Sequence, residues 1–498
     1  MKYLLVVFLV LASLNVSATT WYVRPITAEY GSEDGSSYAA AFDGLGDITW
    51  GVGGVQAGDT LKVCGTFLQT SANTANTNLA MMQVAASGSD GSPIIIDGDC
   101  VAEGDSAIGV LDGDYTSGSV IRTRENTYIT LRNLDLSGAK DAGITAYLAA
   151  ASETATAKHI RVESTVTIRD IHGGASNKVG INLSGTNFTI GDYSTTGNKI
   201  RIYDIGTDGV FCYSCGSLFI DGARIEQVST DDTNGDCVQL QRNANGDRVW
   251  DVYCNKGNND AKQGVVASTL DSQSHIIDIA RLTYLGAGGT VSNGVYAEGQ
   301  TTVRQSYIKD SGNYSLVAAL DNGAKLTAYS NILTGATNGC IDGHKTSAGG
   351  TVIAYNNTLH DCGLAAVDLA AATASHIIKN NTITGNAAVG IYRGTSGTTD
   401  DYNNVFGPIT PYSNNGVAGS ASANDLSVYP KFIGGANPTT PEGFRPFANS
   451  FLCGAGYPSP AKYDYTNKRL GNPPNIGAYG TCAAGRSSYS TRSTYVTR

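Results

Sequence analysis

The chain has 498 residues, of which 61 are glycine and only 15% are charged, a composition typical of strands joined by short polar turns rather than of charged helices. Its formal net charge of −10 argues against a nucleic-acid partner, because nucleic acids attract basic surfaces. No stretch approaches the roughly 20 consecutive apolar residues that a membrane-spanning helix needs, so we expect no membrane insertion.

The first 18 residues have the pattern of a secretory signal peptide. Lys2 supplies the positive charge, residues 4–14 form a short apolar run, and the small residues of a cleavage site end at Ala18. We therefore expect the mature protein to begin near Thr19 and to work outside the cell or at its surface.

Strand patterns dominate from residue 19 onward. Apolar and polar residues alternate, with Gly and Asn between them, and no helical period is visible. A short apolar strand, usually opened by Gly, recurs mostly 24 to 37 residues apart, which suits one coil of a solenoid. The steps are Gly143-Ile144, Gly180-Ile181, Gly209-Val210, Cys237-Val238, Gly264-Val265, Gly294-Val295, Gly339-Cys340, Ala366-Val367 and Gly390-Ile391. We predict an all-β parallel β-helix, with a cap and first coils in residues 19–110 and the repeats in residues 111–402.

A second strand in the later repeats begins with asparagine. Asn331, Asn357 and Asn381 are 26 and 24 residues apart, so they occupy one place in successive coils. Their amides can hydrogen-bond along the turn and satisfy backbone groups that water does not reach. Residues 403–482 should form the last coils and a C-terminal cap over the open strand edges. Residues 483–498 carry three arginines and no acid, a tail that is either flexible or a contact for self-association.

Ten cysteines in an exported chain favour disulfide bonds. Cys212 and Cys215 form a CxxC pattern, but the second pair of ligands that a zinc site needs is missing. If neighbouring coils are linked, the simplest pairing joins Cys64 with Cys100, Cys340 with Cys362, and Cys453 with Cys482.

Aligning the repeats on the glycine step places four polar residues in one column: Asp208, Asp236, Gln263 and Asn293. Adjacent coils lie about 4.8 Å apart, and two ionised carboxylates at that distance repel by about 3.5 kcal/mol at an effective dielectric of 20. A cation, a shared proton or the ammonium of Lys262 could relieve this repulsion. The alternative is that the column is a polar ladder like that of the asparagines.

An acidic turn leads into the second aspartate of this column. Asp231, Asp232 and Asp236 offer the hard oxygen ligands that Ca²⁺ binds, and Lys262 reaches the same side one coil later. The alternative is an ordinary turn, since Asp and Gly are common turn residues.

The residue two places after each aligned glycine should point outward, because side chains alternate along a strand. Aromatic rings stack on sugars and amides bind hydroxyl groups, so this column indicates a glycan-binding face. The alternatives are a tyrosine-rich surface without that role, or a register error of one residue that turns the column inward. The column comprises Asn182, Phe211, Gln239, Val266, Tyr296, Asp368 and Tyr392. Phe211, Gln239 and Tyr296 are its candidate substrate-binding residues.

Segments near both ends carry recognisable patterns: Trp21-Tyr22-Val23, Ala57-Gly58-Asp59-Thr60-Leu61, Ser92-Pro93-Ile94-Ile95-Ile96 and Pro474-Asn475-Ile476-Gly477-Ala478-Tyr479. They resemble secreted bacterial β-helix proteins of the pectate-lyase-like superfamily. The resemblance implies a right-handed parallel β-helix. It implies no single activity, because the superfamily holds lyases, hydrolases, phage spikes and adhesins.

In the lyases of this superfamily, Ca²⁺ held by acidic residues neutralises a uronate carboxylate while a Lys or Arg removes the adjacent proton. The resemblance thus implies Lys262 as the base, Ca²⁺ at Asp231, Asp232 and Asp236, and Arg248 as a further cation for the sugar acid. Asp208 and Asp236 also resemble degraded acidic motifs of polygalacturonase-type hydrolases, although the Gly-His-Gly element is missing.

Three functions follow from these patterns. We expect an extracellular Ca²⁺-dependent polysaccharide lyase acting on a uronate-containing glycan, although the acidic balance of the chain opposes a polyanionic substrate. The alternatives are a non-catalytic glycan-binding or self-assembling surface protein and a polygalacturonase-like hydrolase.

Overall fold

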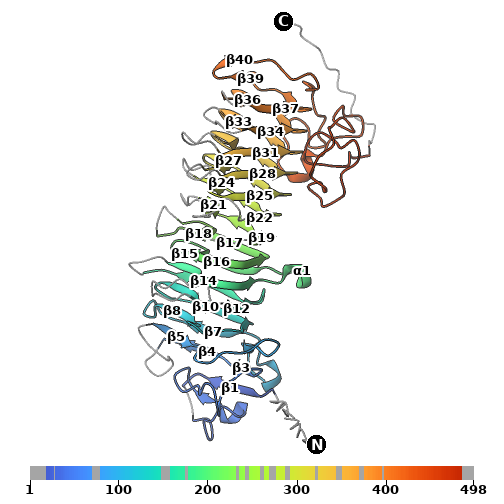
Figure 1. The fold of residues 1–498 in the computed structure, drawn as a ribbon. Coiled ribbons are helices and arrows are strands. Elements are labelled where there is room, and N and C mark those ends of the chain that lie inside the picture. Colours follow the sequence, from blue (N-terminus) through green and yellow to red (C-terminus); the bar gives the residue numbers. More distant parts are fainter. Residues whose placement is uncertain are drawn as a thin grey trace, which may run out of the picture.

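The computed structural model describes residues 18–26, 29–69, 79–146, 157–173, 178–231, 235–241, 246–257, 263–268, 276–286, 292–319, 324–343, 350–369, 375–394 and 397–484. Nearly all regular structure in these residues is β-strand, and the strands stack in parallel into a long solenoid (Figure 1). The predicted all-β parallel β-helix is therefore confirmed. Residues 1–17 and 485–498 lie outside the described residues, so the signal peptide and the role of the basic tail stay predictions.

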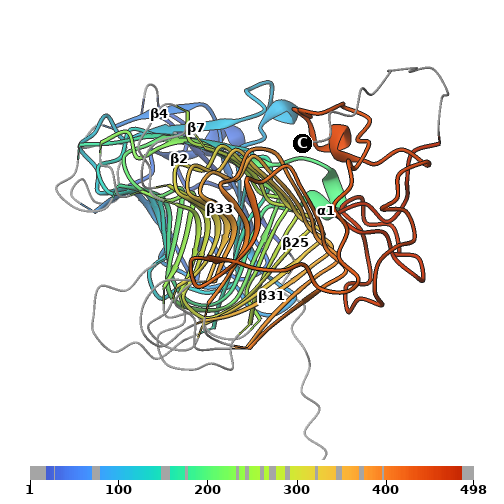
Figure 2. The same cartoon turned by 90° about the horizontal axis from the view of Figure 1, so that it is seen from above.

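The coils superimpose when they are seen along the solenoid (Figure 2), and their strands form three faces. Face 1 contains β5 (Ala80–Gln83), β8 (Ser119–Arg122), β11 (Ala142–Ala146), β18 (Val238–Gln241), β21 (Gln263–Ala267), β24 (Asn293–Ala297), β27 (Tyr314–Ala318), β30 (Gly339–Asp342), β33 (Ala365–Leu369), β36 (Val389–Arg393) and β39 (Thr410–Asn414). Two long strands, β14 (Val179–Ile190) and β16 (Val210–Asp221), begin on face 1 and continue onto face 2.

Faces 2 and 3 complete each coil. Face 2 contains β1 (Thr20–Arg24), β3 (Thr60–Val63), β6 (Ile94–Asp97), β9 (Ile129–Arg132), β12 (Ala157–Val162), β19 (Arg248–Trp250), β22 (Ile276–Ala280), β25 (Gln300–Arg304), β28 (Lys325–Tyr329), β31 (Thr351–Tyr355), β34 (His376–Lys379) and β37 (Thr398–Asp401). Face 3 contains β4 (Thr66–Leu68), β7 (Gly109–Asp112), β10 (Leu134–Ser137), β13 (Thr167–Ile171), β15 (Ile200–Ile205), β17 (Ala223–Val228), β20 (Tyr253–Asn255), β23 (Thr283–Leu285), β26 (Tyr307–Lys309), β29 (Ile332–Thr334), β32 (Thr358–His360), β35 (Thr382–Thr384) and β38 (Asn404–Phe406).

The remaining elements are short. They are β2 (Phe42–Asp43), β40 (Val417–Ala418), the α-helix α1 (Tyr193–Thr196) and three 3-10 helices at Tyr38–Ala40, Val101–Glu103 and Pro441–Phe444.

One hydrophobic core fills the solenoid, because every second residue of each strand points inward. In β18 the side chains of Val238 and Leu240 are fully buried, whereas Gln239 and Gln241, which alternate with them, remain partly exposed. Val238 pairs in register with Val210 of the coil before and Val265 of the coil after, so like residues stack along the axis. Each such aliphatic side chain stabilises the fold by about 1.5–3 kcal/mol on burial.

The recurring glycine of the repeat is explained by lack of space rather than by backbone conformation. A Cβ atom at Gly209 would lie 2.6 Å from Cγ2 of Ile225 on face 3, and one at Gly294 would lie 2.5 Å from Cγ2 of Ile308. Both distances are shorter than van der Waals contact allows, and neither glycine has a left-handed φ. In one coil Cys237 takes this position and bonds across the same gap to Cys254.

All ten cysteines form disulfide bonds. The three predicted pairs, Cys64–Cys100, Cys340–Cys362 and Cys453–Cys482, are confirmed. Cys212 and Cys215 bond to each other where β16 bends between faces 1 and 2, so neither thiol is free to bind a metal.

The predicted asparagine ladder is confirmed and has one more member. The Nδ2 group of Asn331 donates to Oδ1 of Asn357 at 3.0 Å, and Asn357 donates in the same way to Asn381. Asn381 donates to Asn403 at 3.1 Å, and all four amides are fully buried. The ladder fixes the turn between faces 2 and 3.

The C-terminal segment does more than finish the last coil. After β38, β39 and β40, residues 429–484 run back beside the solenoid, where Figure 1 shows them in red next to β28, β31 and β34. Side chains of the coils donate to its backbone: Gln305 to Asp464 O and Asn356 to Asn475 O, each at 2.8 Å. A small second core joins the segment to face 3 through Tyr307, Ile332, Phe432, Phe444, Ala478 and Tyr479.

Candidate functional site

The four polar residues predicted to share a column do so, inside the wall at the start of face 1. The backbone N–H of Asp236 donates to Oδ1 of Asp208 at 2.7 Å, and the backbone N–H of Gln263 donates to Oδ1 of Asp236 at 2.7 Å. In the next coil the backbone N–H of Asn293 donates to the side-chain oxygen Oε1 of Gln263 at 3.1 Å. Asp208 and Asp236 are only 4% and 2% exposed. The column is therefore a polar ladder, one of the two interpretations that the sequence left open.

Lys256 lies close enough to offset the negative charge of this ladder. It follows β20 and is 1% exposed. Burial lowers the pKa of Lys256 to about 7, and the nearby carboxylates of Asp236 and Asp208 act in the opposite direction. The sequence did not single out this lysine, because Lys in an Asn-Lys-Gly turn is normally solvated.

In the part of the chain that the structure describes, the residues predicted to be catalytic do not come together at the surface. Lys262 and Asp232 lie outside the described part of the chain. Asp208 and Asp236 point into the ladder, away from solvent. Their catalytic roles stay predictions, and the burial of both carboxylates weighs against direct contact with a substrate.

Asp231 belongs to a different group at the edge between faces 3 and 1. The ring of His172 lies between two carboxylates, with Nε2 at 3.0 Å from Asp204 Oδ1 and Nδ1 at 3.1 Å from Asp231 Oδ1. Lys178 Nζ is 3.2 Å from the other oxygen of Asp231, and Asp170 approaches Asp204 and His172. We call these five partly exposed residues the His172 cluster.

The coil geometry explains how the His172 cluster forms. Asp170 and Asp204 occupy the same place near the ends of β13 and β15, and each has a left-handed φ, 54° and 57°. Aspartate tolerates this conformation better than most residues. The left-handed residue interrupts regular pairing between Arg169–Tyr203 and Ile171–Ile205, the pairs that flank it. Side chains from successive coils are thereby brought together in the turn that leads to face 1.

The pKa values of two carboxyl groups in the His172 cluster, Asp204 and Asp231, are shifted in opposite directions. Burial raises the pKa of Asp204, and a hydrogen bond with Asp170 raises it further. Burial acts the same way on Asp231, but donation from Lys178 and His172 outweighs it and holds the pKa of Asp231 below its usual value. One edge of face 1 therefore combines a carboxyl group that retains a proton more readily with one that stays ionised.

Three members of the His172 cluster lie close enough together to hold a metal ion. One ligand atom each from Asp170, His172 and Asp204 lies within 4.8 Å of the other two. Imidazole with carboxylates suits Mn²⁺, Fe²⁺ or Zn²⁺, whereas Ca²⁺ prefers oxygen ligands alone. This donor set differs from the predicted Ca²⁺ ligands Asp231, Asp232 and Asp236.

The outward column of face 1 has the predicted register. Asn182, Phe211 and Gln239 pair in successive coils, followed by Val266 and Tyr296, and Asp368 pairs with Tyr392. Phe211, Gln239 and Tyr296 are partly exposed between buried neighbours, so they point outward as expected. The strands that carry Asn182, Phe211 and Gln239 begin directly after the turns that hold the His172 cluster.

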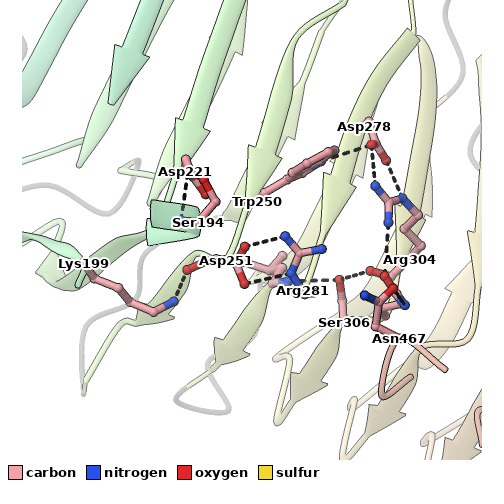
Figure 3. Close-up of polar contacts among 12 residues, drawn as sticks. Ser194, Lys199, Asp221, Trp250, Asp251, Asp278, Arg281, Arg304, Ser306 and Asn467 are labelled. Carbon is pink, nitrogen blue, oxygen red and sulfur yellow. Dashed lines mark hydrogen bonds and ion pairs between the residues drawn. The ribbon is translucent and has the colours of Figure 1, made fainter. Parts of the chain in front are cut away.

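Arg248 does not join this column, because it lies on face 2. Its guanidinium is 6.0 Å from the ring centre of Phe219 and 5.2 Å from that of Trp250. Figure 3 shows the surroundings of Trp250, where Arg281 pairs with Asp251 and Arg304 with Asp278 across successive coils. The predicted substrate-binding residues are therefore divided between two faces.

No family model matches the chain, and no curated protein matches it. Among solved structures, a pectate lyase, Pel9A, is similar over 93% of this chain and 97% of its own, with 16% identity and a TM-score of 0.36. A lacto-N-biosidase from Eubacterium ramulus is similar over 77% of this chain and 67% of its own, with 11% identity and a TM-score of 0.46. A rhamnogalacturonan lyase is similar over 87% of this chain and 96% of its own, with 13% identity and a TM-score of 0.35.

The fold that the chain shares with these structures is a parallel β-helix. In the part of this β-helix that the structure describes, no helix has the length and apolarity to cross a membrane.

Sequence reasoning missed Asp170, His172, Lys178 and Asp204. Alignment on the glycine step compares residues at the start of face 1, whereas these residues lie at the ends of face-3 strands or in the turns after them. The signal that could have found them is the Asp170-Ile171-His172 triplet, with Asp204 and Asp231 following after 34 and 27 residues, each close to one repeat.

Proposed function

We propose that the protein is an extracellular, cation-assisted polysaccharide lyase that cleaves a uronate-containing glycan by β-elimination. The observation that carries this proposal is the His172 cluster at the edge of face 1, beside the outward column of Phe211, Gln239 and Tyr296. The five disulfides and the predicted signal peptide support an extracellular setting.

The column would hold the sugar chain. The ring faces of Phe211 and Tyr296 suit the C–H faces of sugars, and the amide of Gln239 suits hydroxyl groups. A chain bound along the column passes the His172 cluster, because the column and the cluster belong to the same coils.

Asp170, His172 and Asp204 would hold a divalent cation. When bound there, it would supply positive charge that neutralises the uronate carboxylate and makes the adjacent C5 proton more acidic. Loss of that proton and cleavage of the C4–O bond form a C4–C5 double bond, and the leaving oxygen takes up a proton. Lys262 is our proposed base, and the Lys178 ammonium, paired with Asp231, contributes positive charge beside the substrate carboxylate.

Calcium at Asp231, Asp232 and Asp236 is the competing placement of the cation. The two placements differ in ligand type, so metal preference separates them. A site with an imidazole ligand favours Mn²⁺ or Zn²⁺ after chelation, whereas an all-oxygen site favours Ca²⁺.

The test measures ultraviolet absorbance of unsaturated ends released from pectate, alginate, rhamnogalacturonan and glycosaminoglycans. We expect activity on at least one polymer, its loss in chelator, and its return with one class of cation. His172→Ala and Asp204→Asn should lower the rate by about a hundredfold or more, because stabilisation of the developing negative charge usually contributes most to catalysis of this kind. The exposed Asp90→Asn serves as the matched control.

Two results would contradict the proposal. Binding of a polymer without unsaturated products would favour a non-catalytic glycan-binding protein, in which the face 1 column acts alone. New reducing ends without absorbance would favour the hydrolase.

A further inference from the structure

The outward column of face 1 continues toward the N-terminus beyond the predicted residues. Asn182 pairs with Thr145 of β11, and Thr145 pairs with Arg122 of β8. Arg122 therefore lies in the same column as Phe211 and Gln239, about 10 Å from Asn182 at the usual spacing of coils.

Arg122 differs from other half-buried arginines of the solenoid. Five of them, Arg132, Arg169, Arg281, Arg304 and Arg393, each pair with an aspartate. Within the described residues, Arg122 has no ion pair, and its Nε atom is buried without a hydrogen-bond partner. Arg122 is partly exposed, and partial burial of a charge without a counter-ion is unfavourable, so this position favours an anion from outside the chain.

The surroundings of Arg122 add positive charge. Burial lowers the pKa of Arg122, and the neighbouring charge of Arg124 lowers it further, while Glu125 opposes both. Glu125 is itself exposed and lies 3.7 Å from Arg124 Nε. Lys158 reaches the same stretch of chain and donates to the backbone oxygen of Arg124 at 3.1 Å.

The guanidinium of Arg122 is a donor for a carboxylate. A uronate chain carries a carboxylate on every sugar.

We propose that Arg122 forms an anion-binding subsite of face 1, which takes a carboxylate of an acidic oligosaccharide lying along the outward column. The subsite rests on the proposed function only for the class of glycan. It assigns to Arg122 a role in substrate choice.

The test is isothermal titration calorimetry with galacturonate and alginate oligomers, using hexamers and carboxyl-reduced hexamers in chelator, so that no cleavage occurs. Arg122→Gln should weaken binding of at least one acidic hexamer by about tenfold, the usual effect of a lost charged hydrogen bond. Arg122→Lys should retain part of the affinity, because it keeps the charge but loses the two-pronged geometry. Carboxyl-reduced hexamers should bind both variants as they bind the wild type.

Arg161→Gln is the matched control, since Arg161 is a half-exposed arginine of face 2 paired with Glu163 at 3.4 Å. Equal hexamer affinities of wild type and Arg122→Gln would overturn the subsite, as would a wild type that binds no acidic hexamer. An equal loss of affinity for acidic and carboxyl-reduced hexamers would also overturn it. A wild type that binds hexamers through Arg122 but releases no unsaturated ends would sustain the subsite and reject the lyase.

Discussion

Burial decides the chemistry of individual charged residues in this protein. The sequence drew attention to Lys262 because it directly precedes Gln263 of the aspartate column, whereas the described structure places Lys256 near Asp208 and Asp236. Lys256 is fully buried beside a tyrosine ring, with Nζ 5.8 Å from the ring centre of Tyr284. A lysine in such surroundings gives up its proton far more easily than one in water.

Lys256 should make stability depend on pH above neutrality. Unfolded lysine keeps its proton to about pH 10.5, whereas folded Lys256 loses it near pH 7. Between these values the unfolded state binds more protons, so the free energy of unfolding should rise with pH, by at most about 1.4 kcal/mol per pH unit. Urea unfolding from about pH 6 to pH 10 measures this. Lys256→Met should lack the rise, and an unchanged slope in that variant would contradict the assignment.

Turns and strands of each coil are specified by residues that repeat once per coil. Glycine at the start of face 1 leaves room for face-3 side chains, and asparagine at the turn between faces 2 and 3 satisfies buried backbone groups. Asn357 donates to Ala328 O and to Asn381 Oδ1, and its own Oδ1 accepts from the backbone and side chain of Asn331. One side chain therefore joins three coils.

Asn357→Ala should lower the free energy of unfolding by about 3 kcal/mol, because it leaves buried donors and acceptors unpaired. Asn357→Asp should also be destabilising, since the carboxylate cannot donate to Ala328 O or Asn381. Denaturant unfolding with disulfides intact gives the values. The exposed Asn449→Ala is the control and should be neutral. A stability of Asn357→Ala equal to that of the control would mean that the ladder does not hold the turn.

The solenoid as a whole is held together by contacts between segments distant in sequence. Residues 429–484 pack against coils that precede them by more than a hundred residues, as between Gln305 and Asp464. Phe444 is fully buried in the second core, where its ring lies 5.6 Å from that of Phe432 and 5.4 Å from that of His360. This packing fixes the segment against face 3.

Phe444→Ala should destabilise this attachment by about 3 kcal/mol or more, because it leaves a cavity in the second core. The segment should then open locally and become sensitive to protease while the coils remain folded. Limited proteolysis followed by mass spectrometry detects the first cuts. Phe451→Ala, at a residue that is 69% exposed, should behave as the wild type. Cuts that begin within the coils of Phe444→Ala would show that the segment is not a separate unit.

The candidate site could be predicted only in part. The outward column of Phe211, Gln239 and Tyr296 followed from the repeat, because a strand's alternation fixes which side chains share a face. The direction of Asp208 and Asp236 did not follow, since the bend at the start of face 1 turns them into the wall. Asp170 and Asp204 were missed because each of them has a left-handed backbone conformation near the end of its strand. Strand periodicity does not reveal such a residue.

The sequence by itself determined the parallel β-helix, the register of its coils and the asparagine ladder, because these depend on residues that recur once per coil. The three disulfide pairs predicted correctly followed from the assumption that neighbouring coils are linked. The tertiary structure alone decided which charges are buried with Lys256, which meet at His172, which face carries Arg248, and where residues 429–484 lie. Those features depend on turn geometry and on contacts between distant segments, which no local repeat encodes.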